Sequence, residues 1–160
     1  MDSKEKWEEY RFFAESTQYL SDKRQAAAQT YLTVNTSIFA VMAFIIKDAG
    51  LREWALVGVS APLFLTGIIV SYIWRRIILN YKELINFRFE QLKAIEKDQQ
   101  AHGWHQFYLK EDLFYGAARP KKWKNFGFSQ YEKNLPVLFM VLHLLYALAL
   151  LGIAIAASIH

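Results

Sequence analysis

The sequence predicts an all-α membrane protein with three transmembrane helices and long cytoplasmic helical extensions, folded as a single helical unit. Hydrophobic residues make up 54% of the 160-residue chain. They gather in residues 31–46, 54–74 and 136–159, and each of these stretches is free of Lys, Arg, Asp and Glu. A hydrocarbon layer about 30 Å thick selects apolar stretches of this kind.

Residues 1–30 are predicted to form a cytoplasmic amphipathic helix. Within them Trp7, Tyr10, Phe13, Thr17 and Leu20 recur every three or four residues, and no Pro or Gly interrupts the pattern. This helix leads into the first predicted transmembrane helix, residues 31–48. That span is the weakest of the three because polar residues dilute its start, and a buried core helix is the alternative.

The second transmembrane helix is predicted at residues 54–74. It contains Gly58, Pro62 and Gly67, which neighbouring helices can accommodate in lipid. A cytoplasmic helix follows at residues 75–101. Its apolar stripe needs a partner, either the N-terminal helix or a second subunit. The stripe consists of Ile78, Tyr81, Ile85, Phe89, Leu92 and Ile95.

Residues 102–128 lose this periodicity and are rich in aromatic and basic residues, so we expect a cytoplasmic loop with short helical turns. Residues 129–159 then give a cytoplasmic segment and the third transmembrane helix. Ser129 and Glu132 have the spacing of a capping box at its start. Pro136 predicts a kink or a restart near Asn134.

The distribution of basic residues predicts the orientation. Of the 19 lysines and arginines, only Lys47 and Arg52 lie in the short turn between the first two spans. Cytoplasmic loops are enriched in Lys and Arg. The N-terminus and residues 75–135 are therefore expected in the cytoplasm and the C-terminus outside, with the lipid bilayer as the surrounding partner.

A basic tract lies within the predicted loop and contains Arg119, Lys121, Lys122, Trp123 and Lys124. Cations mixed with an aromatic ring suit a segment at the level of anionic lipid headgroups. A soluble nucleotide could use the same cations. The net charge of +4 is explained by this membrane face, so no nucleic-acid partner is expected.

Polar residues within the spans are candidates for helix contacts. Asn35 and Thr36 lie in the first span and His143 in the third. They either join helices or face a lumen, and histidine could also respond to protons. Gly152 and Ala156 have the small-xxx-small spacing of close helix packing, either within one subunit or between subunits.

Motifs for enzymatic chemistry are missing from the sequence. It has no phosphate-binding glycine loop, no nucleophile elbow and no HExxH. Cysteine is absent, and the pair His102 and His105 has no third ligand at a metal-site spacing. The sequence therefore predicts a non-enzymatic protein with no cofactor and no metal site.

A scattered set of residues after the second span carries a family resemblance: Trp74, Tyr81, Asn86, Phe89 and Glu96. The pattern resembles the RipA-type family of small bacterial inner-membrane proteins, which are usually described as octameric. Further matches are Asp22, Lys23, Arg24, Leu32 and Asn35 near the first span, and Tyr131, Glu132 and Pro136 before the third. The basic tract has no place in this pattern.

The resemblance implies a bacterial inner membrane, a ring-like homo-oligomer and a link to stress response or intracellular survival. We expect assembly and helix packing to depend on Trp74, Tyr81, Asn86, Phe89, Glu96, Glu132, Gly152 and Ala156. Two alternatives stay open. One is a regulated pore, with Asn35, Thr36 or His143 at its lumen, and the other is an antiphage membrane effector that responds to a nucleotide or acidic ligand.

Overall fold

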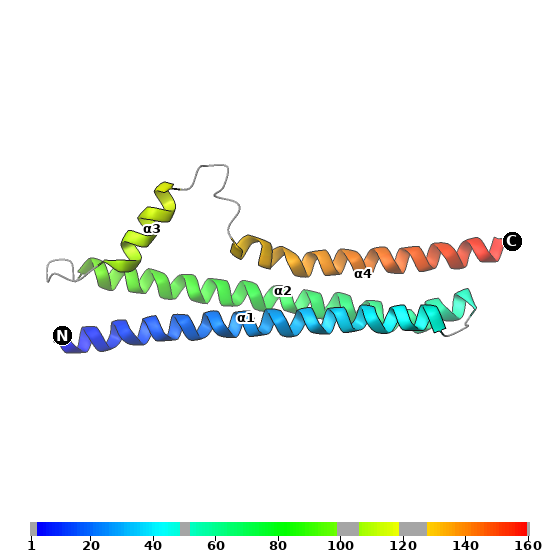
Figure 1. The fold of residues 1–160 in the computed structure, drawn as a ribbon, viewed down its shortest axis with the longest axis horizontal. Helices are drawn as coiled ribbons and strands as arrows, with labels where there is room; N and C mark the ends of the chain where they lie inside the picture. Colours follow the sequence, from blue (N-terminus) through cyan, green and yellow to red (C-terminus); the bar gives the residue numbers. More distant parts are fainter. Residues whose placement is uncertain (1–2, 49–51, 99–105, 119–127, 160) are drawn as a thin grey trace. The chain divides into compact units, whose positions relative to one another are not determined.

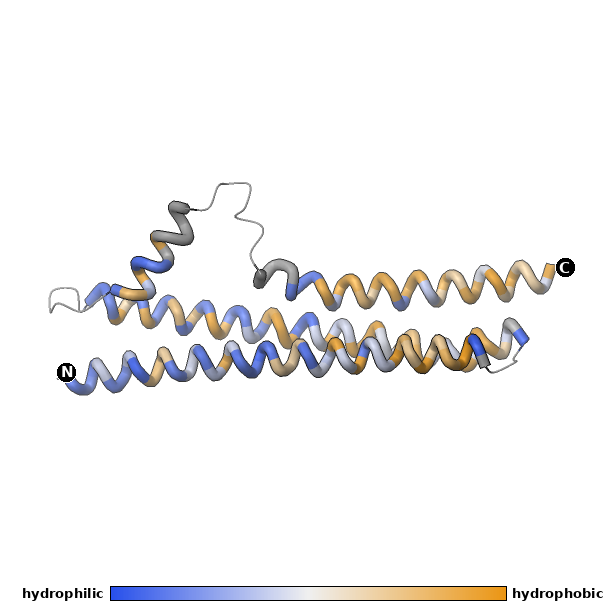
Figure 2. The backbone as a smooth tube through the Cα atoms, in the orientation of Figure 1, coloured by the Kyte–Doolittle hydropathy of each residue, from blue (hydrophilic) through white to orange (hydrophobic). Residues whose placement is uncertain are grey.

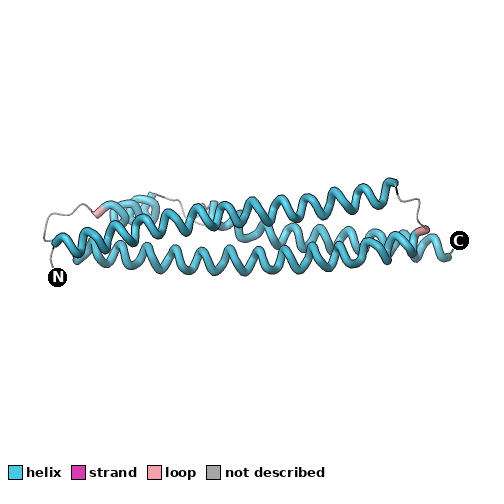
Figure 3. The backbone as a smooth tube through the Cα atoms, turned by 90° about the horizontal axis from the view of Figure 1, so that it is seen from below, coloured by secondary structure: helices cyan, strands magenta, loops and turns pink. Residues whose placement is uncertain are grey.

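The computed structural model describes residues 3–48, 52–98, 106–118 and 128–159. They form four helices in chain order: α1 (Ser3–Asp48), α2 (Glu53–Asp98), α3 (Phe107–Ala118) and α4 (Phe128–Ile159) (Figure 1). Figure 3 shows helices and short loops, with no strand among the described residues. The predicted all-α fold class is therefore confirmed.

Three of these helices, α1, α2 and α4, contain windows that are long and apolar enough to cross a membrane. In Figure 2 the hydrophobic residues gather in the C-terminal half of α1, the N-terminal half of α2 and most of α4. The N-terminal part of α1 is mainly hydrophilic. These features confirm three helices that could span a membrane.

The chain divides into two compact units. Unit 1 contains residues 1–26 and 78–131, and unit 2 contains residues 27–77 and 132–160. The long helices α1 and α2 each contribute one segment to each unit. Within a unit, its α1 segment and its α2 segment lie side by side (Figures 1 and 3). The third helix of unit 1 is α3, and the third helix of unit 2 is α4.

Buried and half-buried positions on α1 and α2 alternate at spacings of four and three residues. This is the heptad spacing that keeps one side of a helix against a partner over many turns. On α1 the series is Tyr10, Ala14, Thr17, Ser21, Arg24, Ala28, Tyr31, Asn35, Ile38, Met42 and Ile45. On α2 it is Ser60, Phe64, Gly67, Ser71, Trp74, Ile78, Tyr81, Ile85, Arg88, Leu92 and Ile95.

Two local features differ from the predictions. The expected loop at residues 102–128 contains the 12-residue helix α3, which is stabilised by groups distant in the sequence. Helix α4 continues through Pro136 without a restart, and the kink stays a prediction. Pro136 is fully buried, and neighbouring helices can hold a transmembrane helix together where proline removes a backbone hydrogen bond.

Candidate functional site

Each unit contains one group of buried polar side chains that joins three helices. In unit 1 the group consists of Tyr10, Glu96 and the start of α3, and we name it the carboxylate junction. In unit 2 it consists of Asn35, Ser71 and His143, and we name it the amide cluster. Glu96, Asn35, Ser71 and His143 all have 0% exposure.

Glu96 is the centre of the carboxylate junction. Its Oε1 accepts a hydrogen bond from the Tyr10 hydroxyl of α1 at 2.9 Å and from the Tyr108 backbone N–H of α3 at 3.0 Å. Its Oε2 accepts the Leu109 backbone N–H at 2.9 Å. A single carboxylate on α2 therefore binds donors from both other helices of the unit.

The position of Glu96 explains why α3 begins where it does. The first backbone N–H groups of a helix have no partner within that helix, and Tyr108 and Leu109 are the second and third residues of α3. Glu96 accepts both N–H groups, as a capping side chain would. Its negative charge also lies at the positive end of the helix dipole.

Burial changes the acid–base behaviour of the two tyrosines beside this carboxylate. The pKa of Tyr10 is raised by burial first, and then by its hydrogen bond to Glu96 and the nearby negative charge. Burial also raises the pKa of Tyr108, with further contributions from the charges of Glu111 and Glu96. Both phenols therefore remain neutral donors or packing groups well above neutral pH.

Asn35 is the centre of the amide cluster. Its Nδ2 donates to the backbone carbonyl of Tyr31 at 2.9 Å. Its Oδ1 accepts the Ser71 hydroxyl of α2 at 2.8 Å and lies 3.2 Å from Nε2 of His143 on α4. The amide therefore links all three helices of unit 2.

These contacts also fix proton positions. Because the Tyr31 carbonyl can only accept, the donating Nδ2 of Asn35 must face it, and Oδ1 must face Ser71 and His143. An amide oxygen accepts but does not donate, so Nε2 is the protonated nitrogen in a neutral His143 ring. Three neutral groups thus bond to one another without a net charge, and among the described residues Nδ1 of His143 is buried without a hydrogen-bond partner.

Close ring packing surrounds the amide cluster. The His143 ring stacks on Phe39 with centroids 4.3 Å apart and an interplanar angle of 7°. A Cβ atom built at Gly67 would lie 2.3 Å from the His143 ring. Gly67 is therefore required for this imidazole to fit against α2.

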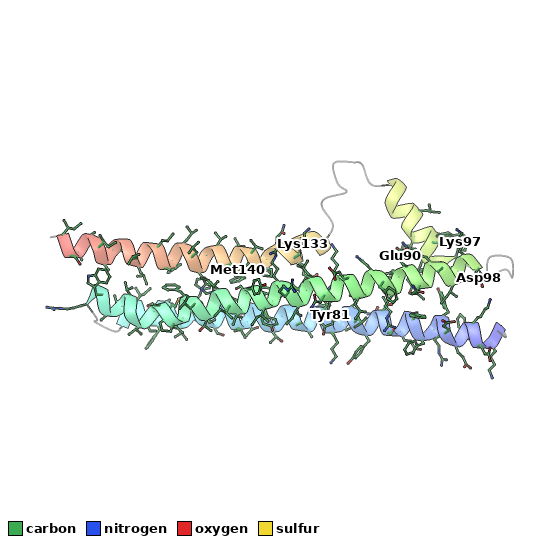
Figure 4. All side chains as sticks on the ribbon, turned by 180° about the vertical axis from the view of Figure 1, so that it is seen from behind. Tyr81, Glu90, Lys97, Asp98, Lys133 and Met140 are labelled. Atoms are coloured by element: carbon green, nitrogen blue, oxygen red, sulfur yellow. The ribbon has the colours of Figure 1, made fainter. Side chains whose placement is uncertain are left out.

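Four of the five residues in the sequence pattern lie at least partly within the helix packing. Trp74 is fully buried and stacks on Tyr31 at 6.2 Å, and Glu96 forms the carboxylate junction. Phe89 makes an edge contact with Tyr108 at 5.6 Å. Tyr81, labelled in Figure 4, is half-buried, whereas Asn86 is exposed.

The remaining predicted residues have varied surroundings. Glu132 is half-buried, whereas Thr36 and Ala156 are exposed. Gly152 is also exposed, and no atom of the described residues lies within 4 Å of a Cβ built there. Packing between subunits therefore stays a prediction for the small-residue pair. The tract with Arg119, Lys121, Lys122, Trp123 and Lys124 lies outside the described residues.

Sequence reasoning missed three contributors to these sites: Tyr108, Ser71 and Gly67. Ser71 and Gly67 share the heptad series of Trp74, which is a signal that periodicity alone could have revealed. Tyr108 lies in the segment expected to be loop, so its contacts had no periodic signal. Within the described part of the chain, no group of three His, Asp or Glu residues could hold a metal ion.

Comparisons with known proteins give one match. The model of the octameric membrane protein family (8xMP) matches residues 7–153. No curated protein matches the chain. No solved structure matches it either.

Proposed function

Because the chain belongs to the octameric membrane protein family, we propose that it is a non-enzymatic subunit of a ring in the bacterial inner membrane. The observation that carries this proposal is that the carboxylate junction and the amide cluster each hydrogen-bond three helices together. Glu96 bonds α1 and α3 to α2, and Asn35 bonds α2 and α4 to α1. These contacts serve helix positioning.

A ring subunit needs rigid surfaces that meet its neighbours in a fixed geometry. The buried hydrogen bonds of the carboxylate junction and of the amide cluster each hold three helices together, which supports such rigidity. Asn86 lies on α2 between two residues of the buried series and is itself exposed. In the proposed ring, Asn86 contributes a polar contact to a neighbouring subunit.

The proposed orientation places the N-terminus in the cytoplasm and the C-terminus outside. The support is the strong asymmetry of Lys and Arg, since only two of the 19 lie near the junction of α1 and α2: Lys47 in the last turn of α1 and Arg52 just before α2. The basic tract with Lys121 and Trp123 then faces anionic headgroups of the inner leaflet. The resemblance to RipA-type proteins supports a role in stress response or intracellular survival.

The test is the mass of the purified complex in nanodiscs, measured by light scattering and accompanied by particle images. We expect a single closed ring of eight subunits. A monomer or dimer would contradict the proposal. Asn86→Leu is expected to lower the oligomeric state while leaving the helical content unchanged, with Glu83→Leu as an exposed control on the same helix.

A second assay separates this function from a regulated pore. Vesicles that contain the purified octamer are expected to release a trapped ion no faster than vesicles without protein. Flux that requires the protein would overturn the non-conducting assembly. A ligand screen by thermal shift, using mononucleotides and acidic headgroup analogues, tests the effector alternative in the same preparation.

A further inference from the structure

The side of α1 opposite its buried heptad series is its outward side. Its exposed residues suit neither lipid around the apolar span nor water around the polar segment. In the apolar span of unit 2, this side exposes Gln29, Thr33, Thr36, Ser37, Ala40 and Ala43, and Phe44 is the one large apolar residue exposed among them. A lipid-facing surface of a transmembrane helix is instead expected to consist of large apolar side chains. Between residues 138 and 148 the exposed surface of α4 has that composition, with Leu138, Val141, Leu144, Leu145 and Leu148.

In unit 1 the same side of α1 has the opposite mismatch. Phe12 is 62% exposed and Tyr19 is 60% exposed, although this part of the helix is mainly hydrophilic (Figure 2). Phe12, Tyr19, Thr33 and Ala40 occupy the same position of the heptad spacing along one continuous helix. Large rings are thus exposed in the polar segment, and small and hydroxyl-bearing residues in the apolar segment.

We propose that this side of α1 packs against a second copy of the chain in the octamer. This inference rests on the proposed ring and names one of its contact surfaces. A single neighbouring subunit would cover the rings of Phe12 and Tyr19 and would also remove the hydroxyl-rich surface from lipid. Small side chains such as Ala40 allow the close backbone approach on which helix association in membranes depends.

The hydroxyl groups on this surface are suited to a dry contact. Thr33 donates to the Gln29 carbonyl at 3.0 Å, and Thr36 donates to the carbonyls of Leu32 and Thr33 at 3.0 and 2.9 Å. Because these groups bond within their own helix, they need no water or partner donor. Their methyl groups remain available for van der Waals packing, which favours a helix contact over a water-filled lumen.

The first test measures assembly of full-length variants in nanodiscs by light scattering. Ala40→Trp blocks close approach in the span, and Phe12→Ser removes an exposed ring in unit 1. Each is expected to lower the association constant at this contact by about tenfold, equivalent to about 1.4 kcal/mol. Leu148→Trp on α4 and Leu113→Ser on α3 change exposed residues and are the controls, and both are expected to remain octameric.

The second test uses the absence of cysteine from the chain. Thr33→Cys and Ala40→Cys are treated in the octamer with a charged, water-soluble thiol reagent. We expect both to be protected, with Lys4→Cys at an exposed position as the reactive control. Rapid labelling of both would show that this side of α1 lines a water-filled lumen, and would overturn the contact.

The outcomes separate this inference from the proposed function. An octameric wild type with octameric Ala40→Trp and Phe12→Ser variants would overturn the contact and leave the ring intact. A monomeric wild type would overturn the ring together with the contact. Circular dichroism of each variant verifies folding, and Phe12→Ser, which changes a residue outside the apolar span, keeps the test decisive if Ala40→Trp does not fold.

Discussion

The carboxylate junction and the amide cluster perform the same task with different chemistry. Each joins three helices through one acceptor side chain, Glu96 in unit 1 and Asn35 in unit 2. The first acceptor is a carboxylate that serves the N-terminus of a helix, and the second is a neutral amide among apolar spans. The difference teaches that the surroundings select the acceptor, since a charge within a hydrocarbon layer is costly.

Removing the carboxylate should have the largest effect. Glu96→Ala leaves the Tyr10 hydroxyl and the two N–H groups at the start of α3 without their acceptor. Because each lost bond to a charged group is worth about 1.5–3 kcal/mol, we expect a loss of about 4 kcal/mol in unfolding free energy. Thermal unfolding in detergent and hydrogen exchange of the α3 amides measure it.

The matched control for this change is Glu90→Ala. Glu90 lies on the same helix, is exposed and pairs only with Lys93 at 3.0 Å among the contacts described for it. Such surface ion pairs contribute about 0–1 kcal/mol. Equal destabilisation by Glu90→Ala and Glu96→Ala would contradict the role of the carboxylate junction.

Placing a charge in the amide cluster breaks the comparison directly. Asn35→Asp preserves the shape of the side chain but puts a carboxylate beside Ser71 and His143. We expect a loss of about 3 kcal/mol, since this is the approximate cost of an acidic residue at the centre of a transmembrane helix. Urea or detergent titration of helicity measures it, and recovery of stability at low pH should accompany protonation of the new carboxyl group.

The reverse exchange, Glu96→Gln, serves as the companion to Asn35→Asp. It removes a charge from the carboxylate junction and should cost less than Asn35→Asp, because a glutamine oxygen can still accept one of the N–H groups. A smaller loss for Asn35→Asp than for Glu96→Gln would show that the surroundings do not select the acceptor.

A methyl group at Gly67 should damage only the amide cluster. Its Cβ would lie 2.3 Å from the His143 ring, so Gly67→Ala is expected to cost about 2 kcal/mol through overpacking. Gly152→Ala is the control, because no described atom lies within 4 Å of a Cβ there. Thermal unfolding of both variants measures the difference, and hydrogen exchange should locate the Gly67→Ala effect in unit 2.

High pH should weaken the carboxylate junction alone, with the smallest effect. The pKa of Tyr10 in the folded protein is raised above the ordinary value of about 10. The neutral phenol's contribution to stability is therefore fully present below pH 10 and is lost as the pH rises through the raised pKa. Ultraviolet titration of phenolate should show that Tyr10→Phe has one tyrosine fewer with a raised pKa.

Much of the helical framework could be predicted because its signals are local. Three uncharged apolar stretches and the periodic residues around Tyr10 and Ile85 are sufficient to predict α1, α2 and α4. Helix α3 could not be predicted in this way. Its start is stabilised by Glu96, and a sequence shows no sign that a carboxylate on one helix will meet the backbone of another.

The sites were predictable only in part for a related reason. Asn35, Glu96 and His143 were noticeable as polar residues at unusual positions. Their partners Ser71 and Tyr10 are common residue types, and only the register between helices brings them within 3 Å of an acceptor. Which side of α1 is exposed depends on the same register, so the surface with Thr33 and Ala40 became visible only in the folded chain.

The alternation of four- and three-residue spacings on α1 and α2 limits how the length of this protein can change. One added residue turns everything beyond it by about 100° around the helix axis, which would carry Asn35 away from Ser71. Seven added residues preserve the register and lengthen a helix by about 10 Å. Relatives should therefore differ in length by whole heptads, inserted in both helices at the same level.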